Sequence, residues 1–263
     1  MTSPVKLLIV GASGRMGTRV IKLMPEFPGL RLHAALASHG SASLGRDSGE
    51  WAGIGPNGVL IGADLEQALV GVGLVIDFSS AVASAAHVRA CAGAGVPLLL
   101  GTTALGTEMP AILEQAARRI PLIAAPNTSL AVTLLQELVG RAAAVLGDGF
   151  DIQIEETHHR SKLDTPSGTA LGLGAAALQG GASGFSGATA TQGLRGAARV
   201  GYAAMRGGDV VGDHAVYFLG QGERLCLSHS ATDRSIFARG ALRAGGWLLG
   251  RAAGAYRMAD VFF

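Results

Sequence analysis

The fold is decided by an apolar stretch near the start of the chain, residues 7–17, which reads L-L-I-V-G-A-S-G-R-M-G. Its apolar half predicts a buried strand, and a helical pattern follows directly over 15–24. Gly11, Gly14 and Gly17 lie in and just after the turn between them. Glycines there let the backbone approach a pyrophosphate, while the helix N-terminus offers N–H groups and a favourable dipole. The stretch predicts dinucleotide binding, although its spacing is GxxGxxG rather than GxGxxG and an ordinary strand–helix turn is the alternative.

Strand and helix patterns alternate through the first half of the chain. The strands are expected at 5–10, 31–37, 74–78, 97–100 and 122–125, and the helices at 15–24, 81–92 and 107–118. Such alternation predicts βαβ units with helices on both faces of a parallel sheet. The expected class is therefore α/β, with a Rossmann-like doubly wound parallel sheet.

The second half has a different pattern. A long apolar helix is expected at 130–146, and period-two alternation from Asp151 and over 216–219 and 224–229 indicates strands with one polar face. A Gly/Ala/Ser-rich piece, 179–196, reads as a flexible loop, and a helix at 235–249 returns to the first domain. We expect a dinucleotide-binding domain at 1–128, completed by 236–263, and a second α+β domain at 129–235 with an open mixed sheet.

Composition limits the classes of function. The 263 residues carry 21 basic and 19 acidic side chains, a net charge of +2, which lacks the basic excess of nucleic-acid-binding proteins. Its uncharged stretches are interrupted by proline or rich in glycine, so none reads as a membrane span. Cys91 and Cys226 form no CxxC pair, which argues against a disulfide framework and a structural zinc site. We expect a cytoplasmic protein without nucleic-acid or membrane partners.

Turns at the carboxyl ends of the predicted strands are candidates for contact with a nicotinamide cofactor, because ligands of open α/β sheets bind there. These turns are Asp77-Phe78-Ser79, Gly101-Thr102-Thr103 and Ala125-Pro126-Asn127. After the second strand the sequence reads Ala37-Ser38-His39, where an NAD site usually has a carboxylate for the ribose 2′-OH. Without that carboxylate NADPH should be tolerated, and the choice between NADH and NADPH stays open.

The segment with the most candidate catalytic and binding residues is 155–170, which reads E-E-T-H-H-R-S-K-L-D-T-P-S-G-T-A. It combines His158, His159 and Lys162 with a helix start, for which Thr165 is the expected N-cap and Pro166 the first helical residue. These cations and the N–H groups near Gly168 and Thr169 suit the carboxylates of a small acid. A solvated polar turn is the alternative. A zinc site is not expected, because adjacent histidines lack HExxH spacing and a third ligand.

This segment, together with G-A-S-G-R-M-G, V-I-D-F-S, G-T-T and A-P-N, resembles the 4-hydroxy-tetrahydrodipicolinate reductase family, also called dihydrodipicolinate reductase. The likeness continues through R-G-G-D-V-V-G-D-H and D-R-S-I-F-A-R-G-A-L to the C-terminal M-A-D-V. It implies a reductase that passes a hydride from NADH or NADPH to a cyclic dicarboxylate on the route to lysine and cell wall. It also implies two domains that close on each other, and a homotetramer formed through the second domain.

The resemblance assigns roles residue by residue. His158 and Lys162 would be the catalytic acid–base pair, and His159, Gly168 and Thr169 would bind substrate. The cofactor contacts would be Gly11, Ala12, Ser13, Gly14, Arg15, Met16, Ser38, Gly101, Thr102, Thr103, Ala125, Pro126, Asn127 and Thr128. The chain departs from the family pattern at Thr128, Ala131 and Thr133, where Phe, Gly and Asn are expected.

Two alternatives stay open beside the reductase. One is a dehydrogenase of the same architecture that acts on another small imine or keto acid. The other is a non-catalytic NAD(P)H sensor, since a glycine-rich turn needs only to bind. His158 and Lys162 argue against the sensor, which has no use for a proton donor.

Overall fold

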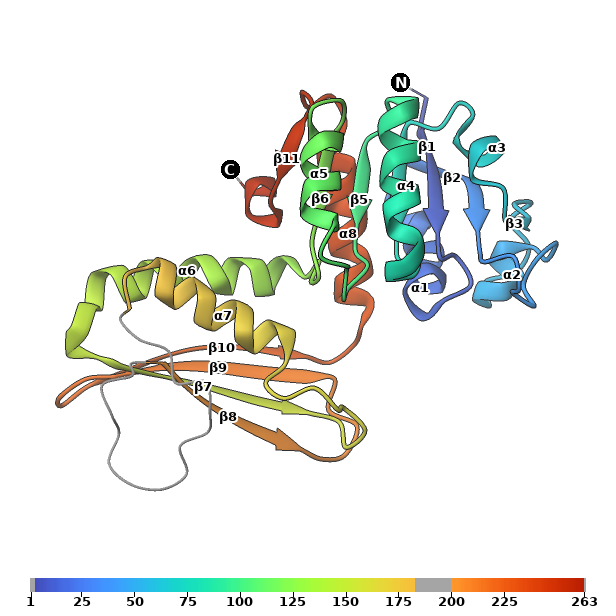
Figure 1. Ribbon diagram of the computed structural model, residues 1–263. Helices are drawn as coiled ribbons and strands as arrows, with labels where there is room; N and C mark the ends of the chain where they lie inside the picture. The colour runs from blue at the N-terminus through green and yellow to red at the C-terminus, as the bar shows by residue number, and fades with distance from the viewer. Residues whose placement is uncertain (1–2, 183–199, 263) are drawn as a thin grey trace. The chain divides into compact units, whose positions relative to one another are not determined.

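The computed structural model describes residues 3–182 and 200–262, which form two compact units (Figure 1). Unit 1 consists of Met1–Ser129 and Ser235–Phe263, and unit 2 of Leu130–Arg234. The chain thus leaves unit 1 after Ser129 and returns to it at Ser235.

The sheet of unit 1 has seven strands, all parallel, in the order β11-β6-β5-β4-β1-β2-β3. The strands are β1 (Val5–Val10), β2 (Leu30–Leu36), β3 (Ile61–Gly62), β4 (Leu74–Asp77), β5 (Leu98–Leu100), β6 (Pro121–Ala124) and β11 (Gly254–Tyr256). The direction of winding reverses between β1 and β4, the point at which open α/β sheets bind ligands. This confirms the predicted doubly wound parallel sheet. The pattern missed β3 and β11, which are too short to show a period.

Helices cover both faces of this sheet (Figure 1). On one side lie α4 (Ala81–Ala94) and α5 (Met109–Ala117), and on the other α1 (Arg15–Leu23) and α8 (Ser235–Leu248). The short helices are α2 (Ser48–Ala52), α3 (Leu65–Leu69), η1 (Met24–Glu26) and η3 (Met258–Val261). Leu8 and Val10 of β1 share a buried cluster with Val88 of α4 and Ile112 of α5. Because alternate residues of a strand point to opposite faces, each buried strand supplies both layers.

Unit 2 has a four-stranded mixed sheet in the order β10-β9-β7-β8. The strands are β7 (Asp151–His158), β8 (Val200–Arg206), β9 (Gly212–Leu219) and β10 (Arg224–Ala231). β7 pairs parallel with β8 and antiparallel with β9, which pairs antiparallel with β10. The predicted second domain with a mixed sheet is confirmed. The sequence pattern missed β8, whose glycine and two alanines weaken the strand signal.

Two helices, α6 (Leu130–Leu146) and α7 (Gly168–Gln179), cover one face of this sheet, and η2 (Gly147–Gly149) continues α6 (Figure 1). Leu135 and Val139 of α6 and Leu173 of α7 pack with Ile152 and Ile154 of β7 in the buried core. By length and composition alone, one helix in the described part of the chain, Leu130–Gly149, could cross a membrane. One face of it packs on the sheet of unit 2.

Two predictions at the end and the start of α7 have different outcomes. The loop expected at 179–196 falls mostly on 183–199, outside the described residues. The expectation that Thr165 caps the helix is wrong, because the N-cap is Ser167, whose hydroxyl accepts a hydrogen bond from the Ala170 N–H at 3.2 Å. Thr165 Oγ1 instead accepts a hydrogen bond from Arg206 at 2.9 Å. Pro166 therefore precedes the helix rather than starting it.

Candidate active site

The glycine-rich turn lies at the topological switch point of unit 1. Gly11 follows β1 with φ of +77°, and a Cβ at this position would lie 2.5 Å from the Phe78 carbonyl oxygen, just after β4. A Cβ on Gly17, in the first turns of α1, would collide with the Gly11 carbonyl oxygen and with Ala12. The turn, the helix and the segment after β4 thus pack without room for side chains.

The start of α1 has the features of a phosphate-binding site. Its N-cap is the exposed Gly14, which contributes no side-chain cap. The first N–H groups of a helix have no partners within the helix, and the positive end of the helix dipole favours anions. A Cβ on Gly14 would meet only the Gly11 oxygen, at 3.3 Å, so the approach to these N–H groups is open. Arg15 is exposed beside them. The residues present therefore fit the pyrophosphate of a dinucleotide.

The remaining residues of the turn are fixed by the protein around them. The buried Ala12 donates its N–H to the Leu36 carbonyl at 2.8 Å, which ties the turn to the end of β2. The Ser13 carbonyl accepts a hydrogen bond from the Trp51 indole at 3.1 Å. The Arg46 guanidinium lies over the Trp51 ring, 5.0 Å from its centroid. Trp51 and Arg46 were missed because nothing in the sequence pattern places α2 beside this turn.

Among the other candidate cofactor contacts, four residues are packed against the protein or direct their side chains into it. Gly101 lies against the Phe78 ring, and the buried Thr102 has its hydroxyl 3.5 Å from an Asp77 carboxylate oxygen. The buried Ala125 donates its N–H to the Leu100 carbonyl. The buried Thr128 donates its hydroxyl hydrogen bond to the Phe237 carbonyl at 2.7 Å. These residues offer backbone groups, not side chains, to a ligand.

The other candidates lie nearer the surface. Met16 and Asn127 are half-buried, and the side-chain Oδ1 of Asn127 accepts a hydrogen bond from the Ser129 N–H at 2.8 Å. Ser38, Thr103 and Pro126 are exposed at the carboxyl ends of three strands. They are the candidates whose side chains stand free at this edge of the sheet.

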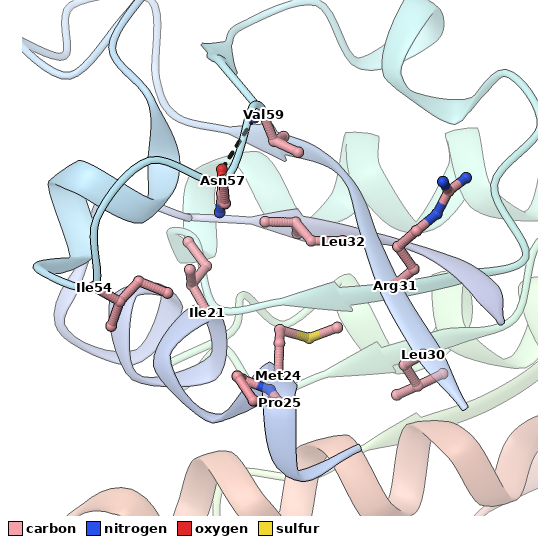
Figure 2. A pocket seen from close by; sticks show the side chains of 9 residues that line it. All are labelled: Ile21, Met24, Pro25, Leu30, Arg31, Leu32, Ile54, Asn57 and Val59. Atoms are coloured by element: carbon pink, nitrogen blue, oxygen red, sulfur yellow. Dashed lines mark hydrogen bonds between the residues drawn. The ribbon is translucent and has the colours of Figure 1, made fainter. Parts of the chain in front are cut away.

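Unit 1 also has a cavity of about 270 Å³, shown in Figure 2. It is lined by Ile21, Met24, Pro25, Leu30, Arg31, Leu32, Ile54, Asn57 and Val59. The lining is mostly apolar, and its Asn57 side chain is held by a hydrogen bond from the Val59 N–H at 3.0 Å (Figure 2). The lining contains none of the sequence-predicted site residues, so we assign the cavity no part in cofactor binding.

The predicted catalytic pair lies at the end of β7 and in the loop behind it. His158 is the last residue of β7 and only 7 % exposed. Lys162 is largely buried and its ammonium group contacts both carboxylate oxygens of Asp164 at 2.7 and 2.8 Å. This contact holds the pKa of Asp164 below its ordinary value. Asp164 therefore fixes the lysine in the absence of substrate.

The predicted substrate-binding residues belong to the same unit. The His159 ring contacts the Ser161 hydroxyl at 2.8 Å through Nδ1 and the Arg234 guanidinium at 3.3 Å through Nε2. Gly168 and Thr169 form the first turn of α7, and Gly168 is exposed. All five residues of the predicted catalytic and substrate set thus lie in unit 2, whereas all the cofactor candidates lie in unit 1.

Sequence reasoning missed a buried carboxylate at the centre of this region. Glu156, only 2 % exposed, accepts hydrogen bonds at Oε1 from the Arg206 guanidinium at 2.8 Å and from the Ser167 N–H at 3.1 Å. Its Oε2 lies 3.3 Å from His158 Nδ1 and 3.8 Å from Nε2 of the buried His214. The alternation of β7 could have revealed it, because Glu156 and His158 are two residues apart and face the same side.

Burial and the neighbouring charges change the proton affinities of this group. Burial lowers the pKa of His158, with Lys162 and Arg206 adding to the effect and Glu156 opposing it. Burial and His158 lower the pKa of His214 to about 4, again opposed by Glu156. Burial raises the pKa of Glu156, but hydrogen bonds from Ser167 and Arg206 outweigh it and leave this pKa below its ordinary value. The carboxylate is therefore ionised and His214 neutral near pH 7.

Glu156, His158 and His214 bring three donor atoms within 4.8 Å of one another in the described part of the chain. Two histidines and one carboxylate also form the ligand set of some zinc sites. Here, however, the Arg206 guanidinium already neutralises the one carboxylate, and the Ser167 hydroxyl lies 3.1 Å from His214 Nε2. We therefore describe the group as a hydrogen-bonding cluster.

Comparisons with known proteins match both units. The family model "Dihydrodipicolinate reductase, N-terminus" matches residues 5–128, and "Dihydrodipicolinate reductase, C-terminus" matches residues 131–262. The 4-hydroxy-tetrahydrodipicolinate reductase of Anaeromyxobacter dehalogenans is 46% identical over 261 residues, covering 97% of each chain. That of Myxococcus xanthus is 43% identical, covering 98% of this chain and 97% of that one.

The solved structures agree at the level of the fold. Dihydrodipicolinate reductase from Paenisporosarcina sp. TG-14, solved with dipicolinate bound, matches with a TM-score of 0.77 at 20% identity and covers 97% of each chain. With both family models and full-length relatives above 40% identity, the chain belongs to the dihydrodipicolinate reductase family.

Proposed function

We propose that the chain reduces 4-hydroxy-tetrahydrodipicolinate to tetrahydrodipicolinate in the biosynthesis of diaminopimelate and lysine, with NADH or NADPH as the reductant. One observation carries the proposal: the same chain has two sites. One is a dinucleotide-type turn at the switch point of unit 1, and the other is the His158–Lys162 loop beside the capped start of α7 in unit 2. The family relatives named for this reaction cover nearly all of the chain. In the balanced reaction one hydride and one proton enter the substrate, and water leaves.

The two units have separate tasks in this proposal. Unit 1 holds the dinucleotide by the turn from Gly11 to Met16, with the first N–H groups of α1, and by the strand ends at Ser38, at Gly101–Thr103 and at Ala125–Thr128. The cofactor supplies the hydride. Since Ser38 is exposed and no carboxylate follows it, a 2′-phosphate meets no repulsion there, which supports use of NADPH as well as NADH.

Unit 2 holds the dicarboxylate. His159, with the N–H groups of Gly168 and Thr169 at the start of α7, binds carboxylate oxygens, because helix N-termini favour anions and an imidazole N–H donates to them. When the substrate binds, the Lys162 ammonium group leaves the Asp164 carboxylate and contacts the substrate. His158 and Lys162 hold the proton that the substrate ring takes up on reduction. Hydride transfer then requires the ligands of the two units to meet, which we expect domain closure to achieve.

The first test is oxidation of NADH and of NADPH followed by absorbance, with substrate generated in place from pyruvate and aspartate semialdehyde by the preceding synthase. We expect turnover with at least one cofactor, and the ratio of the two kcat/KM values measures the preference. Cofactor binding without turnover on this or any other imine would instead favour a sensor. Turnover only on another imine or keto acid would favour a different dehydrogenase.

Replacing Lys162 tests the proposed chemistry. Lys162→Ala should lower kcat by about 100-fold or more, the usual contribution of a positioned proton donor, while the Kd for cofactor changes little because unit 1 is untouched. Leu163→Ala is a matched control, since that neighbouring side chain is 95 % exposed. Full turnover in Lys162→Ala would remove the lysine from the mechanism.

We also propose a cytoplasmic homotetramer built through the sheet of unit 2. α6 and α7 cover one face of that sheet, and the opposite face carries the exposed Met205 of β8 together with the half-buried Tyr217 of β9. Apolar side chains on this uncovered sheet face, Met205 on the edge strand β8 and Tyr217 on β9, support burial against another copy of the chain.

A further inference from the structure

The buried cluster around His158 contains polar atoms with incomplete hydrogen bonding. Among the described residues, Glu156 Oε2, His158 Nδ1 and His214 Nδ1 are buried and lack a hydrogen-bond partner. Native proteins satisfy nearly all such atoms, so each exception needs a reason. Here Oε2 and the His158 Nδ1 face each other at 3.3 Å, within ion-pair distance but without good hydrogen-bond alignment.

The carboxylate of Glu156 cannot turn away from His158 at low cost. Its other oxygen is held by Arg206 on β8 and by the backbone of Ser167 at the start of α7. The strand registers reinforce this arrangement, because His158 pairs with Arg206 across β7 and β8, and Glu156 pairs with His214 across β7 and β9. Three strands and one helix start therefore fix the direction of Oε2.

On the Nε2 side, the His158 ring packs closely against a glycine. Gly212 of β9 lies there, and a Cβ at this position would stand 2.9 Å from His158 Nε2 and 3.2 Å from its Cδ2. The His214 ring contacts His158 edge-on, with 5.0 Å between the ring centroids. The imidazole is thus bounded by a carboxylate at Nδ1, by a second ring at its edge and by a residue without a side chain at Nε2.

We propose that Glu156 is a positioning residue for His158, holding the imidazole through Nδ1–H so that Nε2 is the atom that exchanges a proton with the substrate. This inference rests on the proposed function, in which His158 takes part in proton transfer. A carboxylate on one ring nitrogen fixes the tautomer and the orientation of the other. The long contact in the free protein is expected to shorten when His158 becomes protonated, as catalytic hydrogen bonds often do on complex formation.

The charged groups that face His158 determine how its protonation depends on Glu156. They are Glu156 on the same strand, Lys162 and Asp164 in the following loop, Arg206 on β8 and the neutral His214 on β9. Only Glu156 and Asp164 favour the protonated imidazole, and Glu156 has the stronger effect. Removing the charge of Glu156 therefore lowers the pKa of His158.

The test compares Glu156→Gln with Glu155→Gln in the full chain. Glu155 is adjacent on β7 but points to the other face of the sheet, so it is a matched control for charge and strand position. We expect the high-pH limb of kcat/KM, where His158 loses its proton, to move to lower pH by about one unit or more in Glu156→Gln. The value of kcat should fall by about 10-fold or more, with the cofactor KM little changed. Neither change is expected in Glu155→Gln.

NMR of protein labelled with 13C at histidine Cε1 measures the tautomer and the titration of His158 without turnover. The variant His158→Asn assigns the His158 signal. In the unmodified protein we expect the Nδ1–H tautomer of His158, and in Glu156→Gln a lower titration midpoint. An Nε2–H tautomer in the unmodified protein, or an unchanged midpoint in folded Glu156→Gln, would overturn the proposal. Because the tautomer is measured in the unmodified protein, the test stands even where Glu156→Gln does not fold. Absence of turnover in the unmodified enzyme would overturn the proposed function instead, while the NMR result would still decide the role of Glu156.

Discussion

At the scale of single residues, two glycines at the start of α1 differ in their surroundings. Gly17 is buried, and a Cβ there would collide with the backbone of Gly11 and Ala12, so it sets how closely α1 packs on the turn. Gly14 is exposed, has ordinary extended backbone angles and leaves the first N–H groups of α1 open. We therefore expect Gly17 to serve the fold and Gly14 to serve cofactor binding.

This difference predicts that substitution of Gly17 lowers stability, whereas substitution of Gly14 weakens cofactor binding. Gly17→Ala should lower the free energy of unfolding by about 1–3 kcal/mol, the usual cost of overpacking a tight contact. Gly14→Leu should leave stability nearly unchanged and raise the Kd for NADPH and NADH by at least about 10-fold, since the side chain would cover the phosphate-binding N–H groups. Denaturant unfolding and fluorescence titration measure the two quantities. Tight cofactor binding by Gly14→Leu would contradict the assignment of this turn.

At the scale of elements, β7 shows how much an alternating pattern can predict. The inward face of β7 carries Ile152 and Ile154, followed by Glu156 and His158. This face is therefore apolar at the start of the strand and polar at its carboxyl end. The sequence predicted the strand and its histidine. It did not predict that the inward Glu156 would be met by Arg206 from a strand 50 residues further on, because strand pairing is not encoded in the period of one strand.

The start of α7 gives a second prediction at this scale. Ser167→Ala removes the hydroxyl that accepts from the Ala170 N–H and contacts His214, so we expect a loss of about 1 kcal/mol in the free energy of unfolding. Thr165→Ala should cost less than half as much, since Thr165 is exposed and does not cap the helix. Thermal unfolding of both variants measures the difference, and a larger loss in Thr165→Ala would restore the cap expected from sequence.

At the scale of the whole molecule, acid stability follows from the buried histidines of unit 2. The pKa of His214 lies at about 4 in the folded protein against 6.5 for an unperturbed histidine. Below pH 6.5 the unfolded chain binds a proton that the folded chain does not. The contribution of His214 to the free energy of unfolding is therefore fully present above about pH 6.5. It decreases by about 3 kcal/mol as the pH falls towards 4.

The measurement is the free energy of unfolding from denaturant titrations between pH 4 and pH 8. We expect His214→Gln to show a smaller fall over this range than the unmodified protein, because its unfolded chain lacks the extra proton site. The effect of Glu156 is separate, since its lowered pKa costs stability only below about its ordinary value of 4.5. An identical pH slope in the variant would show that His214 does not titrate in this way.

Assembly is the remaining property at this scale. We expect light scattering to give a mass four times the 26.6 kDa of one chain. Met205→Glu, on the open face of the unit 2 sheet, should reduce the mass. Val145→Glu should not, because this 84 % exposed residue belongs to α6, on the covered side. A single-chain mass for the unmodified protein would contradict the tetramer.

The sequence by itself determined the fold class, and it singled out the segment in which we propose the chemistry. Periods of two and 3.6 residues, together with Gly11 and Gly14 in one turn and Gly17 just after it, are local signals, and so is the His158–Lys162 block. Only the tertiary structure decided that Ser167 rather than Thr165 caps α7, that the Thr102 and Thr128 side chains face inward, and that Glu156, Arg206 and His214 surround His158. The physical reason is that these contacts depend on strand register and helix packing between distant parts of the chain, which no local spacing specifies.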